Sequence, residues 1–200
     1  MVTHLSRLMA NVGGPKSSRR RLIMSAVQPV LLYGAEVRAD TINIEFYRIR
    51  IARVQRQAAL RVCSAYRTVS ALAVLVIAGV IPVKLSAGER KAIYQRKGEI
   101  GKDTARTEER SRKYQQWQNS WQKDTRGRWT ARLIKQIQPW VERRHGEVDY
   151  YLTMFLSGHV DTVCDRMLEG NDYWCCWVYS VSKRVIWTGT RDRSKIRTAR

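Results

Sequence analysis

Apolar residues recur at helical spacing through most of the first 160 positions of the chain. After the breaker Gly-Gly-Pro, this spacing predicts a helix over about 17–39, with Pro29 placed to kink it. Asp40 or Thr41 can cap a second helix. The apolar positions of that helix repeat every three or four residues, at Ile44, Tyr47, Ile51, Val54 and Ala58. Arg53 and Arg56 lie on the opposite face. The pattern is typical of an amphipathic helix with a basic back.

The run from Val69 to Ala78 is apolar nearly all round, which fits either a buried helix or a buried strand. Alanines interrupt its β-branched residues, so a helix is favoured, with Ser70 as its cap and Gly79 as its end. Pro82 then starts a turn. From Val83 to about Trp121, acidic and basic residues alternate, which predicts one long solvated helix.

Two short amphipathic helices are predicted next, over 130–140 and 148–159, and helix signals fade after Gly170. The expected fold is therefore mostly α: a small helical bundle, a polar helical bridge and a loosely ordered C-terminal segment. The expected divisions are a tail or turn over 1–16, a helical domain over 17–100, a polar connection over 101–145, a segment over 146–190 and a disordered basic tail over 191–200.

The net charge of the chain indicates the class of its binding partner. Lys and Arg number 37 against 17 Asp and Glu, which gives a formal charge of +20 and a pI near 10.5. Such an excess attracts polyphosphate, so the backbone of RNA or DNA is the predicted partner. The apolar run over 69–83 is shorter than a membrane span, so no membrane partner is expected. The N-terminus has no apolar signal core, which indicates an intracellular location and free thiols.

Seven arginines are the candidate phosphate ligands, and they are Arg19, Arg20, Arg21, Arg53, Arg56, Arg61 and Arg67. The competing interpretation is an ordinary solvated charged face. Trp117 and Trp121 stand four residues apart on one helix face. They fit a packing stripe better than a platform for stacking bases.

Catalytic signatures are missing from the sequence. A two-metal polymerase needs paired carboxylates, and no such Asp-Asp pair, phosphate-binding glycine loop or Ser-His-Asp order is present. The strong candidates for a zinc site are His159, Cys164, Cys175 and Cys176. Cys175 and Cys176 are adjacent and lack the usual ligand spacing, so bound zinc is not expected. We expect no cofactor.

Three segments together resemble the C-terminal part of the reverse-transcriptase polyprotein of insect non-LTR retrotransposons. They are "LSRLMANVGGPKSSRRRLIMSAVQPVLLYGAEV", "VQRQAALRVCSAYRTVSALAVLVIAGVIPVKLSAGER" and "VDYYLTMFLSGH". The resemblance implies that 17–100 is thumb-like and that 146–190 is a zinc-knuckle region. That region is degenerate, because only Cys175 stands at a ligand position of the knuckle; Val178, Arg184 and Gly189 occupy the other three. Arg38, Val160 and Thr162 also depart from the family's residues.

The same resemblance implies a function. A thumb-like segment would hold the template-primer duplex by sequence-independent backbone contacts, beside a palm domain that binds Mg²⁺ in the parent RNA-directed DNA polymerase. The resemblance further implies that this chain is located in the nucleus and has no polymerase activity of its own. Two alternatives remain open. One is an interaction protein that docks through the 83–121 helix with Trp117 and Trp121, and the other is a reading frame without function.

Overall fold

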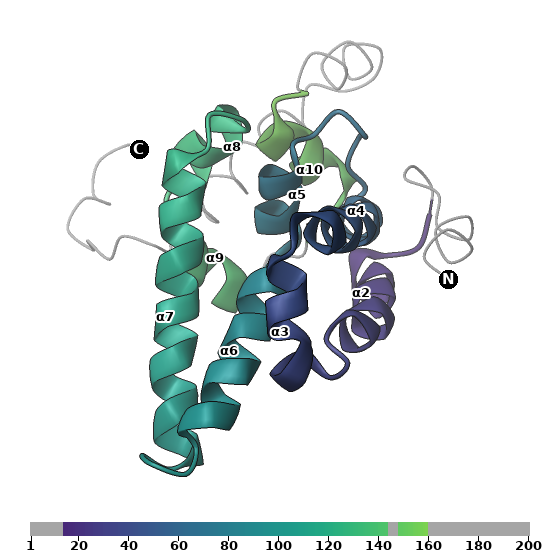
Figure 1. The fold of residues 1–200 in the computed structure, drawn as a ribbon. Coiled ribbons are helices and arrows are strands. Elements are labelled where there is room, and N and C mark those ends of the chain that lie inside the picture. Colours follow the sequence, from purple (N-terminus) through teal and green to yellow (C-terminus); the bar gives the residue numbers. More distant parts are fainter. Residues whose placement is uncertain (1–13, 144–147, 160–200) are drawn as a thin grey trace, which may run out of the picture.

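A computed structural model describes residues 14–143 and 148–159 (Figure 1). All regular structure in these two ranges is helical, which confirms the prediction of a mostly α fold. The helices are α2 (Ser17–Leu31), α3 (Ala35–Asn43), α4 (Glu45–Val62), α5 (Ala71–Ala78), α6 (Val83–Arg96), α7 (Lys102–Lys123), α8 (Arg128–Leu133), α9 (Ile137–Glu142) and α10 (Tyr150–Ser157). The predicted domain boundaries remain predictions, and the expected 191–200 tail lies outside the described residues.

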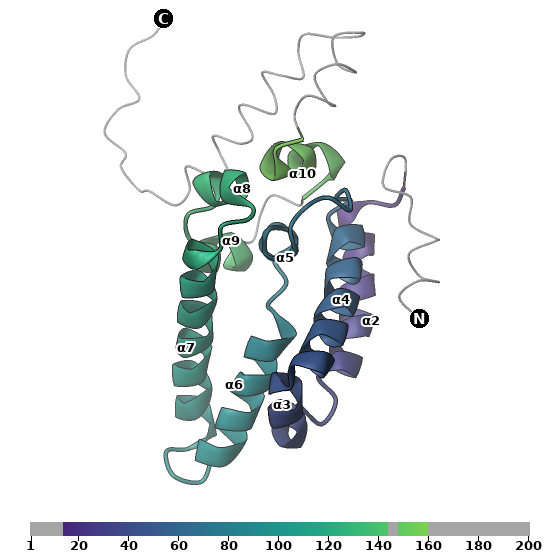
Figure 2. The same ribbon diagram turned by 45° about the horizontal axis from the view of Figure 1, so that its top comes forward.

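The helices form a bundle around the short apolar helix α5. Helices α2 and α4 lie side by side and run in opposite directions, and α3 connects them at one end (Figure 2). Helix α3 packs on α6, and α6 packs on α7. Helices α8 and α10 contact each other, and α10 also contacts α5 (Figure 2).

The predicted helix over 17–39 is wrong as a single element, because the chain breaks between α2 and α3. Pro29 lies inside α2 without ending it. The break comes at Gly34, whose φ of +64° is a left-handed conformation that residues with a Cβ rarely adopt. Helix α3 then continues past the predicted end to Asn43.

Helix α5 has the predicted caps. The Ser70 hydroxyl accepts a hydrogen bond from the Ala73 amide at 3.3 Å. Gly79 ends the helix with a φ of +66°. The residues from Ala73 to Ile77 are all buried, which explains why the run is apolar on every face and shows no helical period.

The predicted helix from Val83 to Trp121 is also wrong, since α6 and α7 are two helices joined by a turn. Gly98 and Gly101 lie in this turn, and Gly101 has a φ of +81°. The alternating charges pair across the resulting hairpin: Arg96 contacts Glu109 at 2.7 Å. Charge alternation here therefore reflects pairing between two helices, whereas the sequence pattern indicated one solvated helix.

The stretch over 130–140 holds two short helices, α8 and α9, where the pattern predicted one. The side chain of Gln118 stabilises the break between them, because its amide donates to the Lys135 carbonyl at 2.8 Å and accepts from the Ile137 amide at 2.9 Å. Helix α10 falls inside the predicted 148–159 segment, with the Asp149 carboxylate capping it at the Leu152 amide.

Trp117 and Trp121 belong to the main core, with exposed fractions of 0% and 2%. The Trp121 indole donates to the Ile134 carbonyl at 3.0 Å. Neither ring is available to an outside partner, so docking through these two residues is wrong and the packing interpretation is confirmed. Among the described helices, none is alone long and apolar enough to cross a membrane; α5 and α6 qualify only as a pair bent by 65°.

Candidate nucleic-acid interface

The antiparallel pairing of α2 and α4 brings the start of α2 against the end of α4. Arg19 and Arg21 are exposed there. Arg20 is 4% exposed; its guanidinium donates to the Pro15 carbonyl at 2.9 Å and to the Arg61 carbonyl at 3.3 Å. Burial, reinforced by the charge of Arg61, lowers the pKa of Arg20. We therefore treat Arg20 as a residue that joins the two helices and leave it out of the proposed binding surface.

The packed face of α4 differs from the predicted one. Ile44, Tyr47 and Val54 are exposed, whereas Gln55 is 2% exposed at the centre of the packed face. The Gln55 amide group donates to the Ile81 carbonyl at 2.7 Å, and its oxygen accepts from the Val83 amide at 3.0 Å. A hydrophobicity pattern assigns polar residues such as Gln55 to the exposed face of a helix. This is why the predicted packed face of α4 differs from the observed one.

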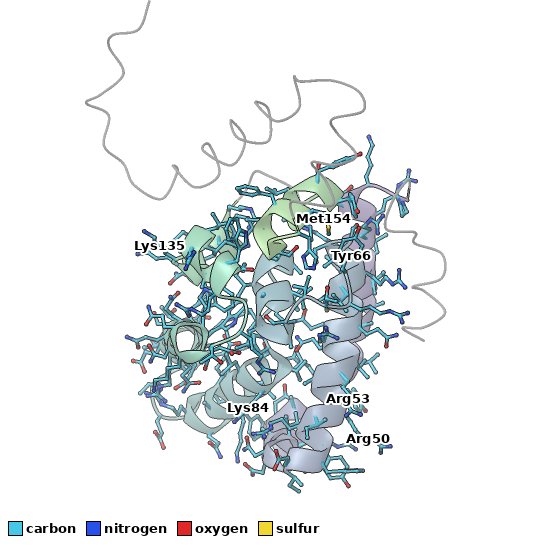
Figure 3. The ribbon with its side chains drawn as sticks, turned by 90° about the horizontal axis from the view of Figure 1, so that it is seen from above. Arg50, Arg53, Tyr66, Lys84, Lys135 and Met154 are labelled. Atoms are coloured by element: carbon cyan, nitrogen blue, oxygen red, sulfur yellow. The ribbon has the colours of Figure 1, made fainter. Side chains whose placement is uncertain are left out.

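The outer side of α4 carries a stripe that we call the α4 stripe, formed by Arg50, Arg53 and Gln57. Spacings of three and four residues place these side chains on one helix face. All three are exposed, and Figure 3 shows Arg50 and Arg53 projecting away from the bundle. The guanidinium of Arg50 also lies 4.7 Å from the centre of the Phe46 ring. Sequence reasoning found Arg53 and missed Arg50, although the same spacing contains it.

Arg56 is partly buried and supports the chain next to it. Its Nη2 donates to the Arg67 carbonyl at 2.5 Å and to the Val69 carbonyl at 2.8 Å. These bonds hold the loop that leads into α5. Arg67 is exposed on that loop, and Arg56 bonds to its backbone carbonyl.

The charges on α2 and α4 cannot neutralise one another. Helix α2 contains three arginines and no acid, and α4 contains five arginines and one acid, Glu45. Glu45 pairs with Arg48 at 3.1 Å. No acid on these two helices therefore remains for Arg50 and Arg53.

On the opposite side of the bundle, several basic residues pair with acids. Lys91 contacts Asp40 at 2.6 Å, Lys113 contacts Glu89 at 2.7 Å and Arg110 contacts Glu142 at 3.2 Å. These pairs connect α3 with α6, α6 with α7 and α7 with α9. Acids are scarcest on the α2 and α4 side: these two helices carry eight arginines and one acid, whereas α6 and α7 together carry ten Lys and Arg and four acids. The arginines of α2 and α4 are therefore the least neutralised by their own helices.

Arg143 is a basic residue near α2 that the sequence analysis missed. Its guanidinium lies 3.5 Å from the centre of the Trp140 ring. Burial lowers its pKa to about 10, and the charge of nearby Arg21 acts in the same direction. No motif around Arg143 signals this position; only the fold brings it near α2.

Comparison with known proteins identifies the relatives. No family model matches the chain, and no solved structure matches it. A Retrovirus-related Pol polyprotein from type-1 retrotransposable element R1 2 of Nasonia vitripennis is 28% identical over 178 residues, which cover 79% of this chain and 43% of that protein. The Putative 115 kDa protein in type-1 retrotransposable element R1DM of Drosophila melanogaster is 30% identical over 173 residues, which cover 76% of this chain and 17% of that protein.

The chain is related to R1 retrotransposon polyproteins. It spans less than half the length of either relative. The thumb-like assignment and the knuckle assignment, taken from the resemblance to insect non-LTR retrotransposons, remain predictions.

The zinc candidates lie mostly outside the described residues, which include His159 but not Cys164, Cys175 or Cys176. Within the described ranges, no group of three or more His, Cys, Asp or Glu side chains is placed to hold a metal ion. The His159 ring bonds to the hydroxyls of Thr68 and Ser157, at 2.9 Å in each case.

Proposed function

We propose that this chain corresponds to a segment of an R1-type retrotransposon polyprotein that holds nucleic acid through its phosphate backbone. The α4 stripe is the centre of the binding surface, and the exposed Arg19 and Arg21 of α2 extend it. The segment binds and positions; the chemistry belongs to the parent RNA-directed DNA polymerase. By family resemblance, the ligand is a template-primer duplex and the location is nuclear.

The observation that carries the proposal is the uneven neutralisation of charge. Several basic side chains on α6 and α7 pair with acids, whereas Arg50 and Arg53 project into solvent from a helix that has five arginines and one acid. A phosphate strand that contacts such arginines releases its condensed counterions, which drives binding. Contacts of this kind position nucleic acid without reading its sequence.

The test is the double substitution Arg50→Ala and Arg53→Ala. Loss of two phosphate contacts is expected to weaken binding to RNA–DNA hybrids of unrelated sequence alike. The slope of log K against log salt should become shallower by about two units, because each contact contributes about 0.9. Fluorescence anisotropy across a salt series measures both quantities.

The matched control is Arg106→Ala with Arg132→Ala, two exposed arginines on α7 and α8. It removes the same charge from the other side of the bundle, so it should leave the slope within a few tenths of the unmodified chain. Equal slopes for the two double variants would refute the assignment of the α4 stripe.

A second candidate function is docking of another protein segment. Large apolar side chains are exposed where α2 ends and where α3 and α4 begin, and they include Val30, Tyr33, Val37, Phe46, Tyr47 and Ile49. Tyr33 is 78% exposed and Val37 is 81% exposed. Exposed apolar patches of this kind mark contact surfaces. The partner we propose is the palm of the parent polyprotein, and such docking, unlike phosphate binding, does not weaken steeply with salt.

A further inference from the structure

A cavity of about 570 Å³ lies where α4, α5, α8 and the end of α10 meet. Its lining is rich in polar side chains, of which the Thr130 hydroxyl already donates to the Leu156 carbonyl at 2.8 Å. The polar side chains are those of Arg56, Thr68, Ser70, Arg126, Thr130, Ser157 and His159. Two arginines with several hydroxyls are the groups that proteins use to bind phosphate oxygens.

Arg56 is held in place on one wall of the cavity. Its Nη2 donates both of its hydrogen bonds to carbonyls of the adjoining loop. For Nη1 and Nε, no acceptor is recorded within the described residues. A guanidinium fixed in this way keeps three N–H groups ready for a ligand and loses little conformational entropy when it binds.

Arg126 comes from the loop on the opposite side, which lies very close to the start of α5. A Cβ on Gly127 would stand 2.8 Å from the Ser70 hydroxyl, and the φ of Gly127 is +70°. The Asp124 carboxylate accepts from the Arg126 amide at 2.8 Å and lies 3.5 Å from its Nε. Asp124 therefore fixes the loop and offsets part of the charge of Arg126.

The start of α5 adds backbone donors to the same wall. Ser70, Ala71 and Ala73 line the cavity, and the Ser70 hydroxyl accepts from the Ala73 amide. No acceptor is recorded in the described ranges for the amides of Ala71 and Leu72. The partial positive charge of a helix start adds to the attraction that the arginine side chains supply.

The exposed Trp129 is a neighbour of residues that line the cavity, although it does not line the cavity itself. Trp129 precedes the lining residue Thr130 and is 43% exposed. Its indole donates to the Phe155 carbonyl at 2.8 Å. A Cβ on Gly158 would lie 3.2 Å from the ring, and Gly158 stands between the lining residues Ser157 and His159. The ring is thus fixed on the end of α10 with part of its surface open.

We propose that this cavity binds a phosphate of a single-stranded nucleic-acid segment, with the adjacent unpaired base stacked on Trp129. The inference rests on the proposed function, because it adds a second contact to the same nucleic acid. A duplex buries its base faces in stacking and offers none to Trp129, whereas a single strand exposes them. The cavity is therefore specific for unpaired strand, and the α4 stripe binds backbone of either kind.

The test compares a labelled single strand of about 12 nucleotides, within the site sizes typical of single-strand binders, with a hybrid duplex of the same sequence. Three variants of the full chain are used: Arg126→Ala, Trp129→Ala and Trp129→Phe. Trp129→Ala should weaken single-strand binding about fivefold or more, and Trp129→Phe should restore most of it. Arg126→Ala should make the single-strand salt slope shallower by about 0.7.

Duplex affinity should be unchanged in all three variants, and Arg132→Ala is the control from the same helix as Trp129. Competition with inorganic phosphate separates binding of a free anion from binding of a strand. If the cavity binds a strand, phosphate should weaken single-strand binding no more than another salt at the same ionic strength does. Circular dichroism of each variant verifies the fold.

Single-strand binding that is equal in all variants, in a chain that still binds duplex, would overturn the cavity proposal alone. Equal losses for duplex and single strand would overturn it too, since the cavity would then not distinguish them. If the unmodified chain binds neither ligand, the proposed function fails as well.

Discussion

Replacing Trp121 with Ala is expected to lower the free energy of unfolding by about 3–5 kcal/mol, the usual cost of removing a large aromatic side chain from a core. Trp121 is 2% exposed, and its indole donates to the Ile134 carbonyl. The substitution therefore removes packing and leaves a buried carbonyl without its donor. Urea unfolding followed by circular dichroism measures the change.

Trp129→Ala is the matched control for this substitution. Trp129 is 43% exposed and makes one hydrogen bond to a carbonyl, so its loss should cost only about 1 kcal/mol. Similar losses for the two variants would show that Trp121 is not part of the core. They would reopen the hypothesis that α7 presents tryptophans to a partner.

Replacing Gln55 with Met is expected to destabilise the fold by about 2–6 kcal/mol. Methionine has nearly the same shape, but it can neither donate to the Ile81 carbonyl nor accept from the Val83 amide. Each of these backbone groups then loses its partner away from water, at about 1–3 kcal/mol for each group. Thermal and urea unfolding of the variant measure the cost.

Gln57→Met provides the comparison, because Gln57 lies on the same helix and is exposed. We expect a change within about 0.5 kcal/mol for that substitution. A Gln55→Met variant as stable as Gln57→Met would mean that the α5–α6 connection is not held by Gln55, and that the packed face of α4 is the one the apolar stripe predicted.

Local signals predicted the elements whose ends are marked in the sequence. Ser70 and Gly79 delimit α5 as predicted, because side-chain and glycine caps act within a few residues. The same logic was available at Gly98 and Gly101, which separate α6 from α7. The charge alternation on either side obscured it, since charges that pair across a hairpin resemble those of one long helix.

The candidate site depends on tertiary structure in ways that a pattern cannot express. The sequence pattern makes Arg20 and Arg53 equally good candidates for phosphate binding. In the fold, however, Arg20 is buried where α2 packs on α4, whereas Arg53 is exposed. Arg126 lines the cavity beside α5, and Trp129 lies next to the lining residue Thr130, only because α8 contacts α10, which in turn contacts α5. The charge of the whole chain predicted nucleic acid as the partner. The positions of the acids and ion pairs in the fold are the basis on which we propose the face that binds it.

Arginine footprinting tests the central claim most directly. The full chain is modified with an arginine-specific reagent in the presence and absence of an RNA–DNA hybrid, and the modification of each residue is quantified by mass spectrometry. The account predicts that the hybrid protects Arg50 and Arg53, while Arg106 and Arg132 react equally in both samples. Protection of Arg106 and Arg132 with Arg50 and Arg53 unaffected would contradict it.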